Sequence, residues 1–495
     1  MKGTSSLTNK TTRAIVWSFT ELMGNYGIQF IVQIILARLL VPEHFGVFGM
    51  ILVFIAISNS IVDSGFTQAL IRDQHTTQED YSTVFFFNLG ISFVLYGILF
   101  ISSKGISVFF EEPQLLEIIR VLSIVIIINA FAIIQRVMLM KKIDFRTITK
   151  ISFISSVISG TITIIVAVLG FGVWSLVVNM LSLQIIQTLL LIIYNRWLPS
   201  FIFSYLSFKR FFSFGSKLLL SGLIDTFYNN LYFLIIGKFF SITQLGYYTN
   251  AVKVRDLASQ SLASTVQRVT YPVLSSIQED EKRLELGFKK IIKISAFINF
   301  PLLIGLAAIG NPLFLILFGE KWILSVIYFQ LLCFAGMLYP LHALNLNILQ
   351  VKGRSDLFLR LEIIKKGLLT ILIVLSFLFK LGIIGLICAA VISSYLSLLI
   401  NMYYSAREIS YSTKEQLKDL LPIFGISIVM GVIVFMIGKI IILGSILTLF
   451  SQISIGIVAY IGLSKICKIR ELHLLIELLR SFLSGQKSRK SEGNS

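Results

Sequence analysis

The chain has 495 residues, of which 56% are hydrophobic and 14% are charged, and its mean hydropathy is +0.87. Soluble domains carry about 25% charged residues, so this composition excludes a soluble globular protein and indicates one whose solvent is largely lipid. The net charge of +18 does not indicate a nucleic-acid partner. Most Lys and Arg residues lie at those ends of the apolar stretches that would face the cytoplasm, as is usual for membrane proteins. This basic face is expected to hold anionic membrane lipids.

Apolar stretches of about 20 residues can cross roughly 30 Å of hydrocarbon, and the sequence contains fourteen of them. In chain order the predicted spans cover residues 14–37, 44–66, 82–103, 114–136, 147–169, 172–194, 211–236, 244–268, 287–309, 323–348, 359–379, 382–404, 418–438 and 442–464. The eighth is the least apolar and is expected to be broken or to line a cavity. The even number of spans and the charge distribution place both termini in the cytoplasm, and the first span is expected to be retained.

The sequence indicates an internal duplication. Residues 37–40 and Gly46 return as residues 237–240 and Gly246, at an offset of 200. Further matches at an offset of 212 pair Asp144 with Asp356 and residues 169–170 with residues 381–382. Chance similarity between apolar spans does not align charged positions such as Asp144. Two parallel repeats that enclose a central cavity are typical of transporters.

We therefore predict an all-α polytopic membrane protein of about 14 transmembrane helices, with two six-helix lobes related by pseudo-two-fold symmetry plus two extra helices. The expected N-lobe covers residues 1–194 and the C-lobe residues 195–404. The two extra spans occupy residues 405–469. Residues 470–495 are expected to form an amphipathic helix along the inner leaflet and a basic cytoplasmic tail.

The sequence lacks the parts of the common catalytic sites. Neither a nucleotide-binding loop nor a nucleophile elbow occurs, so we expect no enzyme and no cofactor. The histidines have no ligand spacing and the cysteines indicate no disulfide framework, so we expect no metal site. The short outer loops argue against a polymerase or ligase of polysaccharide chains. The residues concerned are His44, His75, His342, His473, Cys333, Cys388 and Cys467.

Polar residues inside the spans are the candidate site, because ionisable groups in lipid are costly and usually face a cavity. In span 1 and span 7 they recur at steps of four, which places them on one helical face. The candidate substrate-binding residues are Lys217, Lys253, Arg255, Arg120, Asn25, Gln29 and Asn229, and the candidate ion-coupling residues are Glu21, Asp63 and Asp225.

Local ion pairing is the alternative explanation for several of these charges: Asp256 can pair with Lys253 or Arg255, and Glu117 with Arg120. Because Lys253 and Arg255 are two residues apart, only one can face a cavity unless the eighth span is broken. Cations in a cavity suit a phosphate or diphosphate, whereas the carboxylates suit a coupling proton, a sodium ion or a cationic drug.

Four short segments resemble the polysaccharide-export flippases of the multidrug/oligosaccharidyl-lipid/polysaccharide (MOP) superfamily, in particular the O-antigen (Wzx-type), capsule and teichuronic-acid exporter branch. They are the turn after span 1 (Leu39–Met50), the segment after span 2 (Ser64–Arg72), the turn Leu245–Tyr248 and the step Gly382–Gly385. The resemblance covers nearly the whole chain, but its motifs are structural and identify no substrate.

The resemblance implies a flippase of the bacterial cytoplasmic (inner) membrane that moves undecaprenyl-diphosphate-linked oligosaccharide outward by alternating access, for surface polysaccharides such as lipopolysaccharide O-antigen or capsule. Membrane lipids, a coupling proton or sodium ion and other polysaccharide-assembly proteins are the further expected partners. A drug/cation antiporter of the same superfamily is the alternative.

Overall fold

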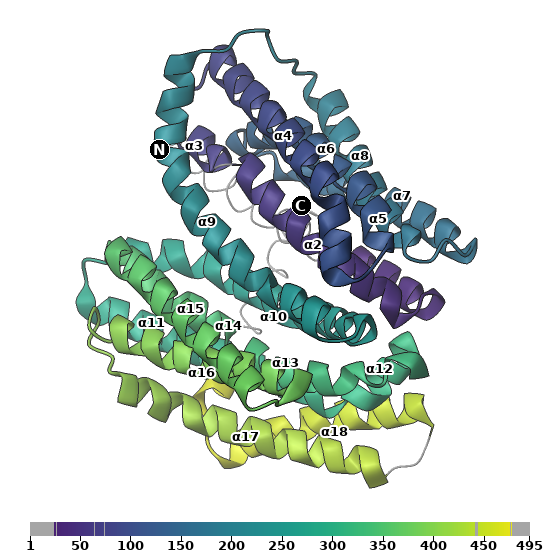
Figure 1. The fold of residues 1–495 in the computed structure, drawn as a ribbon. Coiled ribbons are helices and arrows are strands. Elements are labelled where there is room, and N and C mark those ends of the chain that lie inside the picture. The colour runs from purple at the N-terminus through teal and green to yellow at the C-terminus, as the bar shows by residue number, and fades with distance from the viewer. Residues whose placement is uncertain are drawn as a thin grey trace, which may run out of the picture. The chain divides into compact units, whose positions relative to one another are not determined.

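The computed structural model describes residues 24–25, 27–63, 65–73, 75–440, 444–475 and 477. Within these residues all regular secondary structure is helical, as the composition predicted (Figure 1). The chain divides into two compact units, Met1–Asn250 and Ala251–Ser495. The lobe boundaries expected at residues 194 and 404 are boundaries of a sequence repeat, and they stay predictions.

In the first unit α7 packs against α8, α8 against α6, α6 against α4, and α2 against α9. Some of these pairs are neighbours in sequence, such as α7 and α8, whereas α2 and α9 are far apart in the chain. Their bounds are Gly27–Leu39 for the first helix, then α2 (Pro42–Asp63), α3 (Phe66–Arg72), α4 (Gln78–Phe110), α5 (Gln114–Leu122), α6 (Ile124–Lys141), α7 (Phe145–Val168), α8 (Trp174–Asn195) and α9 (Tyr205–Phe239), while α10 (Ile242–Ser276) begins in this unit and ends in the next.

In the second unit α11 packs against α17 and α13, α17 against α18, and α16 against α13 and α15. The helices of this unit are α11 (Glu281–Ala308), α12 (Gly310–Phe318), the 3₁₀ turn η1 (Glu320–Trp322), α13 (Ser325–Gly336), α14 (Tyr339–Val351), α15 (Ser355–Leu378), α16 (Gly382–Ser405), α17 (Thr413–Ile440) and α18 (Ser445–Ile466).

Ten segments of the described chain are long and apolar enough to cross a membrane. They coincide with ten of the predicted spans. The four other predicted positions hold Gly27–Leu39, α9, α10 and α15, which are shorter or more polar. Side chains on the outside of the bundle include Phe201, Ile440 and Ile466, which are 96%, 75% and 77% exposed. A surface this apolar is typical of a protein that faces hydrocarbon. A polytopic membrane protein is therefore confirmed, and the number fourteen stays a prediction.

Small residues let helices approach closely where they pack. On α7, the buried Ser152, Ser156, Ser159 and Gly160 lie at helical spacing. A Cβ at Gly160 would meet Val32 Cγ2 at 2.6 Å, so only glycine fits beside the first helix. Small residues at helix interfaces are the usual device of membrane bundles, because dispersion contacts replace the hydrophobic effect there.

The repeat has a different register in its second half than the sequence matches indicated. Ile143 and Gly353, just before α7 and α15, both have positive φ (56° and 71°), and the next residues, Asp144 and Arg354, each donate N–H to the carbonyl five residues back. The positive-φ pairs after these helices are Gly170 with Lys380 and Gly172 with Gly382. All are 210 residues apart, so the match of Asp144 with Asp356 was wrong by two residues. The sequence match was based on identical side chains, whereas the structural correspondence is based on backbone conformation.

The start of the predicted amphipathic tail is fixed to the second unit by charge. Glu471 is buried and pairs with Lys293 at 2.8 Å. Asp419 of α17 pairs with Lys289 at 3.2 Å and accepts a hydrogen bond from the Tyr411 hydroxyl at 2.9 Å. Burial and the Asp419 carboxylate raise the pKa of Tyr411, so the hydroxyl stays protonated and donates. Residues 478–495, the rest of the predicted tail, lie outside the described residues.

Candidate functional site

The two turns that carry the repeat contact each other reciprocally. A Cβ on Gly46 would lie 2.1 Å from the carbonyl oxygen of Ile242, and a Cβ on Gly246 would lie 1.9 Å from that of Pro42. Residues 42 and 242, and 46 and 246, are the same positions of the two repeats. The first turns of α2 and α10 therefore pack symmetrically: the glycine of each turn lies against a carbonyl oxygen of the other. The preceding helices end at residues 39 and 239, which are also 200 residues apart.

One hydrogen bond closes this reciprocal contact: Thr243 Oγ1 donates to Glu43 Oε1 at 2.7 Å. Positions 43 and 243 are again equivalent in the two repeats. A side-chain hydrogen bond between exposed groups contributes little free energy, about 0.5 to 1.5 kcal/mol, and it forms and breaks easily. The contact is therefore tight in shape, and this hydrogen bond contributes only a small part of its free energy.

We predict that Gly46→Ala and Gly246→Ala each destabilise this contact, because the added methyl group meets a carbonyl oxygen of the facing turn. Overpacking of this kind costs about 1 to 3 kcal/mol. Melting temperatures of the purified variants check the prediction. Gly90→Ala in α4 is the matched control, since a Cβ there meets no atom within 4 Å. Equal melting temperatures for all three variants would contradict the reciprocal contact.

The polar stripe of the first span is hydrogen-bonded to its neighbours. Asn25 Oδ1 accepts from Gln29 Nε2 at 3.2 Å and from Ser156 Oγ of α7 at 2.5 Å. One turn further along, Gln33 Nε2 donates to Asn250 Oδ1 at 2.8 Å. Asn25 is half-buried and Gln29 is exposed. The stripe thus lies between the first helix, α7 and α10, with Gln29 as its accessible amide.

Helix α10 is unbroken from Ile242 to Ser276, so the expected break of the eighth span is absent. Successive residues of an α-helix are about 100° apart, so Lys253 and Arg255 point to nearly opposite sides. Arg255 is 8% exposed, and its Nη2 pairs with Asp256 Oδ1 at 2.6 Å while its guanidinium carbon lies 5.2 Å from the Tyr339 ring centre. A Cβ on Gly336 would touch Arg255 Cδ at 2.9 Å. The pairing with Asp256, one of the two alternatives, is therefore present, and Arg255 packs inside the second unit.

Lys253 is half-buried on the other side of α10. Of the seventh span's candidates, Asp225 is half-buried and Asn229 is exposed on α9. The side chain of Lys217, whose backbone belongs to α9, lies outside the described residues, and so does Glu21.

Arg120 is held by α4 rather than by the acid one turn away. Its Nε donates to Ser103 Oγ at 3.0 Å, and the guanidinium carbon lies 4.5 Å from the Phe100 ring centre. Glu117 is exposed, and among the described residues it forms no ion pair with Arg120. The alternative in which Glu117 neutralises Arg120 was wrong. Arg120 ties α5 to α4.

Asp63 lies in a polar cavity of about 270 Å³ inside the first unit. Its Oδ1 accepts from Thr67 N at 3.3 Å and from Thr67 Oγ1 at 2.5 Å, which satisfies the first turn of α3 after the break at Gly65. Helix starts are commonly capped in this way. The cavity is lined by Asp63, Thr67, Asn129, Ala132, Ile133, Arg136, Val137, Met140, Gln184 and Gln187.

Asn129, Arg136 and Gln184 were not among the candidates from the sequence. The signal was present, because an amide within an apolar stretch is costly in lipid for the same reason as a charge. The strongest signals in the sequence were ionisable groups and the polar stripes of spans 1 and 7, and Asn129 and Gln184 lie outside both. Their convergence needed the pairing of α6 with α8.

A second polar cluster lies in the second unit, between α14 and α16. His342 contacts Ser394 Oγ and Asn401 Nδ2, each at 3.1 Å, and Ser405 Oγ donates to Asn345 Oδ1 at 2.5 Å. His342 looked like one of four scattered histidines in the sequence. Within the described residues no group of three His, Cys, Asp or Glu side chains is placed to hold a metal ion.

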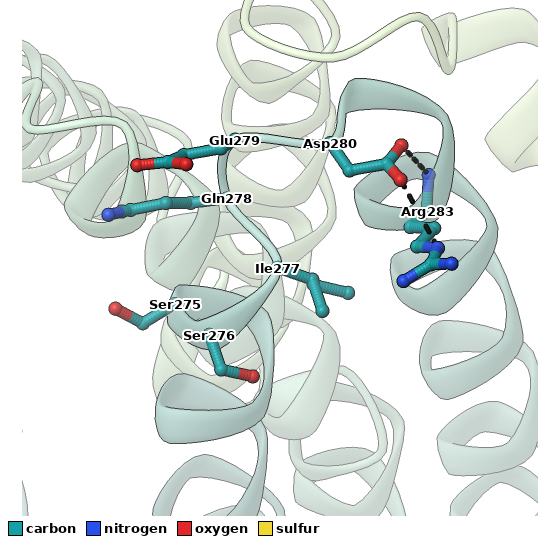
Figure 2. Close-up of a pocket in the computed structure, with 7 residues that line it drawn as sticks. All are labelled: Ser275, Ser276, Ile277, Gln278, Glu279, Asp280 and Arg283. Carbon is teal, nitrogen blue, oxygen red and sulfur yellow. Dashed lines mark hydrogen bonds and ion pairs between the residues drawn. The ribbon is translucent and has the colours of Figure 1, made fainter.

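The turn between α10 and α11 forms an open pocket of about 320 Å³ (Figure 2). Figure 2 shows Gln278 and Glu279 pointing away from Asp280 and Arg283. Asp280 caps α11 through Arg283 N at 3.0 Å and pairs with Arg283 Nε at 3.2 Å. Since one turn supplies all of its residues, this pocket has the character of a connecting loop rather than of a binding site.

The fold is shared with solved transporters. The lipid II flippase MurJ in an inward closed conformation superposes with a TM-score of 0.75 over 91% of this chain and 98% of its own, at 17% identity. An inward-facing multidrug resistance MATE family transporter of the MOP superfamily gives 0.60 over 80% of this chain and 98% of its own, at 18% identity. At such identities the likeness shows the fold alone. The described helices define a polytopic membrane protein with the MurJ and MATE fold.

The family follows from sequence. A family model described as polysaccharide biosynthesis protein matches residues 35–327, and this chain belongs to that family. The teichuronic acid biosynthesis protein TuaB of Bacillus subtilis (strain 168) is 30% identical over 299 residues. That alignment covers 60% of this chain and 62% of TuaB, so the chain spans less than two thirds of this curated relative.

Proposed function

We propose that this protein is a flippase that carries undecaprenyl-diphosphate-linked oligosaccharide across the bacterial inner membrane for surface polysaccharide synthesis. The observation that carries the proposal is the combination of a polysaccharide biosynthesis family with the fold of a lipid II flippase over 91% of the chain. The family supplies the link to polysaccharides, and the fold is one that moves a lipid-linked sugar in MurJ. The drug/cation antiporter remains the second candidate, because a MATE transporter has the same fold.

Deletion of the gene should make a lipid-linked oligosaccharide accumulate on the cytoplasmic side, because assembly of the repeat continues while export stops. Mass spectrometry of extracted polyprenyl lipids checks this expectation and identifies the sugar repeat. The antiporter alternative predicts an unchanged lipid pool and an increased sensitivity to cationic drugs.

Transport by alternating access is supported by the reciprocal contact of the α2 and α10 turns. With the N-terminus in the cytoplasm, the turns at residues 40–42 and 240–242 lie at the outer end of the bundle. A tight contact there would close the outer side in one state, and the two turns would separate in the other. The pseudo-two-fold relation of two six-helix lobes belongs to the same proposal.

The diphosphate is proposed to bind to cations of α5, α9 and α10. Lys217, Lys253, Arg255 and Arg120 are the proposed cations; of these, Arg255 pairs with Asp256 and Arg120 donates to Ser103. Arg255 and Arg120 therefore also position their helices, and the amides Gln29, Asn25 and Asn229 are the proposed neutral hydrogen-bonding groups. A charge-assisted hydrogen bond to a diphosphate is worth about 1.5 to 3 kcal/mol.

Ion coupling is proposed to use Asp225 or Glu21. Asp63 is less suited, because its carboxylate caps α3 and shares a cavity with Arg136. A carboxylate near a cavity can bind and release a proton or sodium ion in alternation. Flipping by Asp225→Asn protein should then lose its dependence on proton and sodium gradients. A rate in the unaltered protein that is the same with and without both gradients would rule coupling out.

The topology is proposed to place both termini in the cytoplasm of the bacterial cell, with the protein in the inner membrane. Phe171 and Lys142 are exposed at opposite ends of α7, so they report on opposite faces. In intact cells a membrane-impermeant maleimide should label Phe171→Cys and spare Lys142→Cys. The reverse labelling pattern would show that the topology is opposite to the proposed one. Other polysaccharide-assembly proteins are expected as partners at the outer face.

A further inference from the structure

The cavity around Asp63 has the lining of a binding site. Three elements that are distant in sequence contribute polar side chains to it: the α2–α3 segment, α6 and α8. Its volume of about 270 Å³ equals the share of about nine water molecules in the liquid, at roughly 30 Å³ each. This space suits one sugar ring, and a whole oligosaccharide is too large for it.

The amides of the cavity are aligned in a chain. Gln184 Nε2 donates to Asn129 Oδ1 at 3.2 Å, and Asn129 Nδ2 donates to Asn59 Oδ1 at 3.0 Å. Gln187 Nε2 donates to Ser152 Oγ at 3.5 Å. Each of these hydrogen bonds uses the nitrogen of the amide as the donor. The carbonyl oxygens of Gln184 and Gln187 are thereby left as acceptors.

The cavity is therefore rich in unused acceptors. Both hydrogen bonds to Asp63 go to Oδ1. In the part of the chain that the structure describes, Asp63 Oδ2, Gln184 Oε1 and Gln187 Oε1 accept no hydrogen bond. A diphosphate offers only acceptors and negative charge, so these oxygens repel it. A sugar hydroxyl donates as well as accepts, and it complements this lining.

Charge and size decide between a sugar and a cation. Asp63 and Arg136 line the same cavity, so its formal charge is balanced and a neutral ligand is favoured. A dehydrated cation needs six to eight oxygens within about 2.6 Å, a much tighter cage than this cavity. The guanidinium of Arg136 also repels a cation, whereas it can donate to a hydroxyl oxygen.

We propose that this cavity is a sugar subsite, in which Asp63, Gln184 and Gln187 accept hydrogen bonds from the hydroxyl groups of one neutral sugar of the passenger and Asn129 orients Gln184. The inference rests on the proposed function for the identity of the passenger. It separates recognition of the sugar, inside the first unit, from recognition of the diphosphate by Lys253 on α10.

Saturation-transfer NMR on the purified full-length protein in lipid nanodiscs tests the subsite. The probes are free methyl glycosides of glucose, galactose and N-acetylglucosamine. We expect saturation transfer to at least one of them, weakened about 5-fold by Gln184→Met and by Asn129→Leu, because each variant keeps the number of side-chain heavy atoms and removes hydrogen bonds. Gln114→Met, at the exposed start of α5, is the matched control and should bind as the unaltered protein does.

Several outcomes overturn the subsite. The first is that none of the three glycosides shows saturation transfer. The second is that transfer is as strong in both variants as in the unaltered protein. The third is that the protein binds sodium or inorganic pyrophosphate and that Asn129→Leu abolishes this binding. If Asn129→Leu does not fold, the result for Gln184→Met alone decides whether the subsite exists. Flipping of lipid-linked oligosaccharide is measured separately in the same nanodisc preparation after transfer to liposomes. Sugar binding without flipping would leave the subsite standing and refute the proposed function.

Discussion

A short reversible crosslink between positions 43 and 243 should stop transport, and its reduction should restore it. In this structure Thr243 and Glu43 are hydrogen-bonded at 2.7 Å, where the α2 and α10 turns meet around Gly46 and Gly246. If these turns form the outer closure, a covalent bond between them holds the protein closed to the outside. A conformational cycle that cannot pass through one state has no turnover, so the expected loss is nearly complete.

The measurement uses Glu43→Cys/Thr243→Cys in a background without native cysteines, treated with a short bis-methanethiosulfonate and then with dithiothreitol. The background replaces Cys333, Cys388 and Cys467 by Ala. The two single-cysteine proteins, treated in the same way, control for modification alone. Transport by the crosslinked protein at the rate of the reduced protein would show that these turns do not separate during the cycle.

Loss of the Lys253 charge has the second largest expected effect. Lys253→Ala should weaken binding of the lipid-linked substrate by about 10- to 150-fold, the equivalent of one charge-assisted hydrogen bond of 1.5 to 3 kcal/mol. Lys253→Arg should recover part of the affinity, because it keeps the charge. Binding of the fluorescent substrate to protein in detergent is the direct measurement. Unchanged affinity in Lys253→Ala would show that the diphosphate does not bind to Lys253.

Arg255 provides the comparison, because its charge is already paired. Arg255→Ala removes the partner of Asp256 and the packing on Gly336, so we expect a folding defect. Arg255→Ala/Asp256→Ala removes both charges and should recover folding. If that double variant binds substrate normally, Arg255 is a positioning residue. Arg283→Ala, from an exposed pair with Asp280, is the control with little expected effect on either property.

The fold was largely predictable because the spacing of apolar stretches is set by membrane thickness. The turn at Gly46 and Gly246 was found as a sequence match, since a close approach of backbones excludes every side chain at both positions. The match of Asp144 with Asp356 failed, because the backbone conformation relates Ile143 to Gly353, which are 210 residues apart. The ends of corresponding helices share positive φ angles, and Gly170 corresponds to Lys380 although the two residue types differ.

The candidate site was less predictable, because partners come from other helices. The sequence left open whether Arg255 pairs locally, and only the structure places it against Asp256 and Tyr339. The helical step did show that Lys253 and Arg255 diverge, and this holds because α10 is unbroken. The cavity amides Asn129 and Gln184 escaped notice, since they are neither ionisable nor part of the polar stripes of spans 1 and 7.

Reconstituted flipping tests the central claim most directly. Liposomes containing the purified protein are loaded with fluorescent lipid-linked oligosaccharide, and dithionite added outside destroys the fluorophores that reach the outer leaflet. The proposed flippase predicts that the protected inner pool disappears in the presence of the protein and persists after crosslinking of positions 43 and 243. A protected pool as large as in protein-free liposomes, together with uptake of a cationic dye by the same preparation, would contradict the flippase and identify an antiporter.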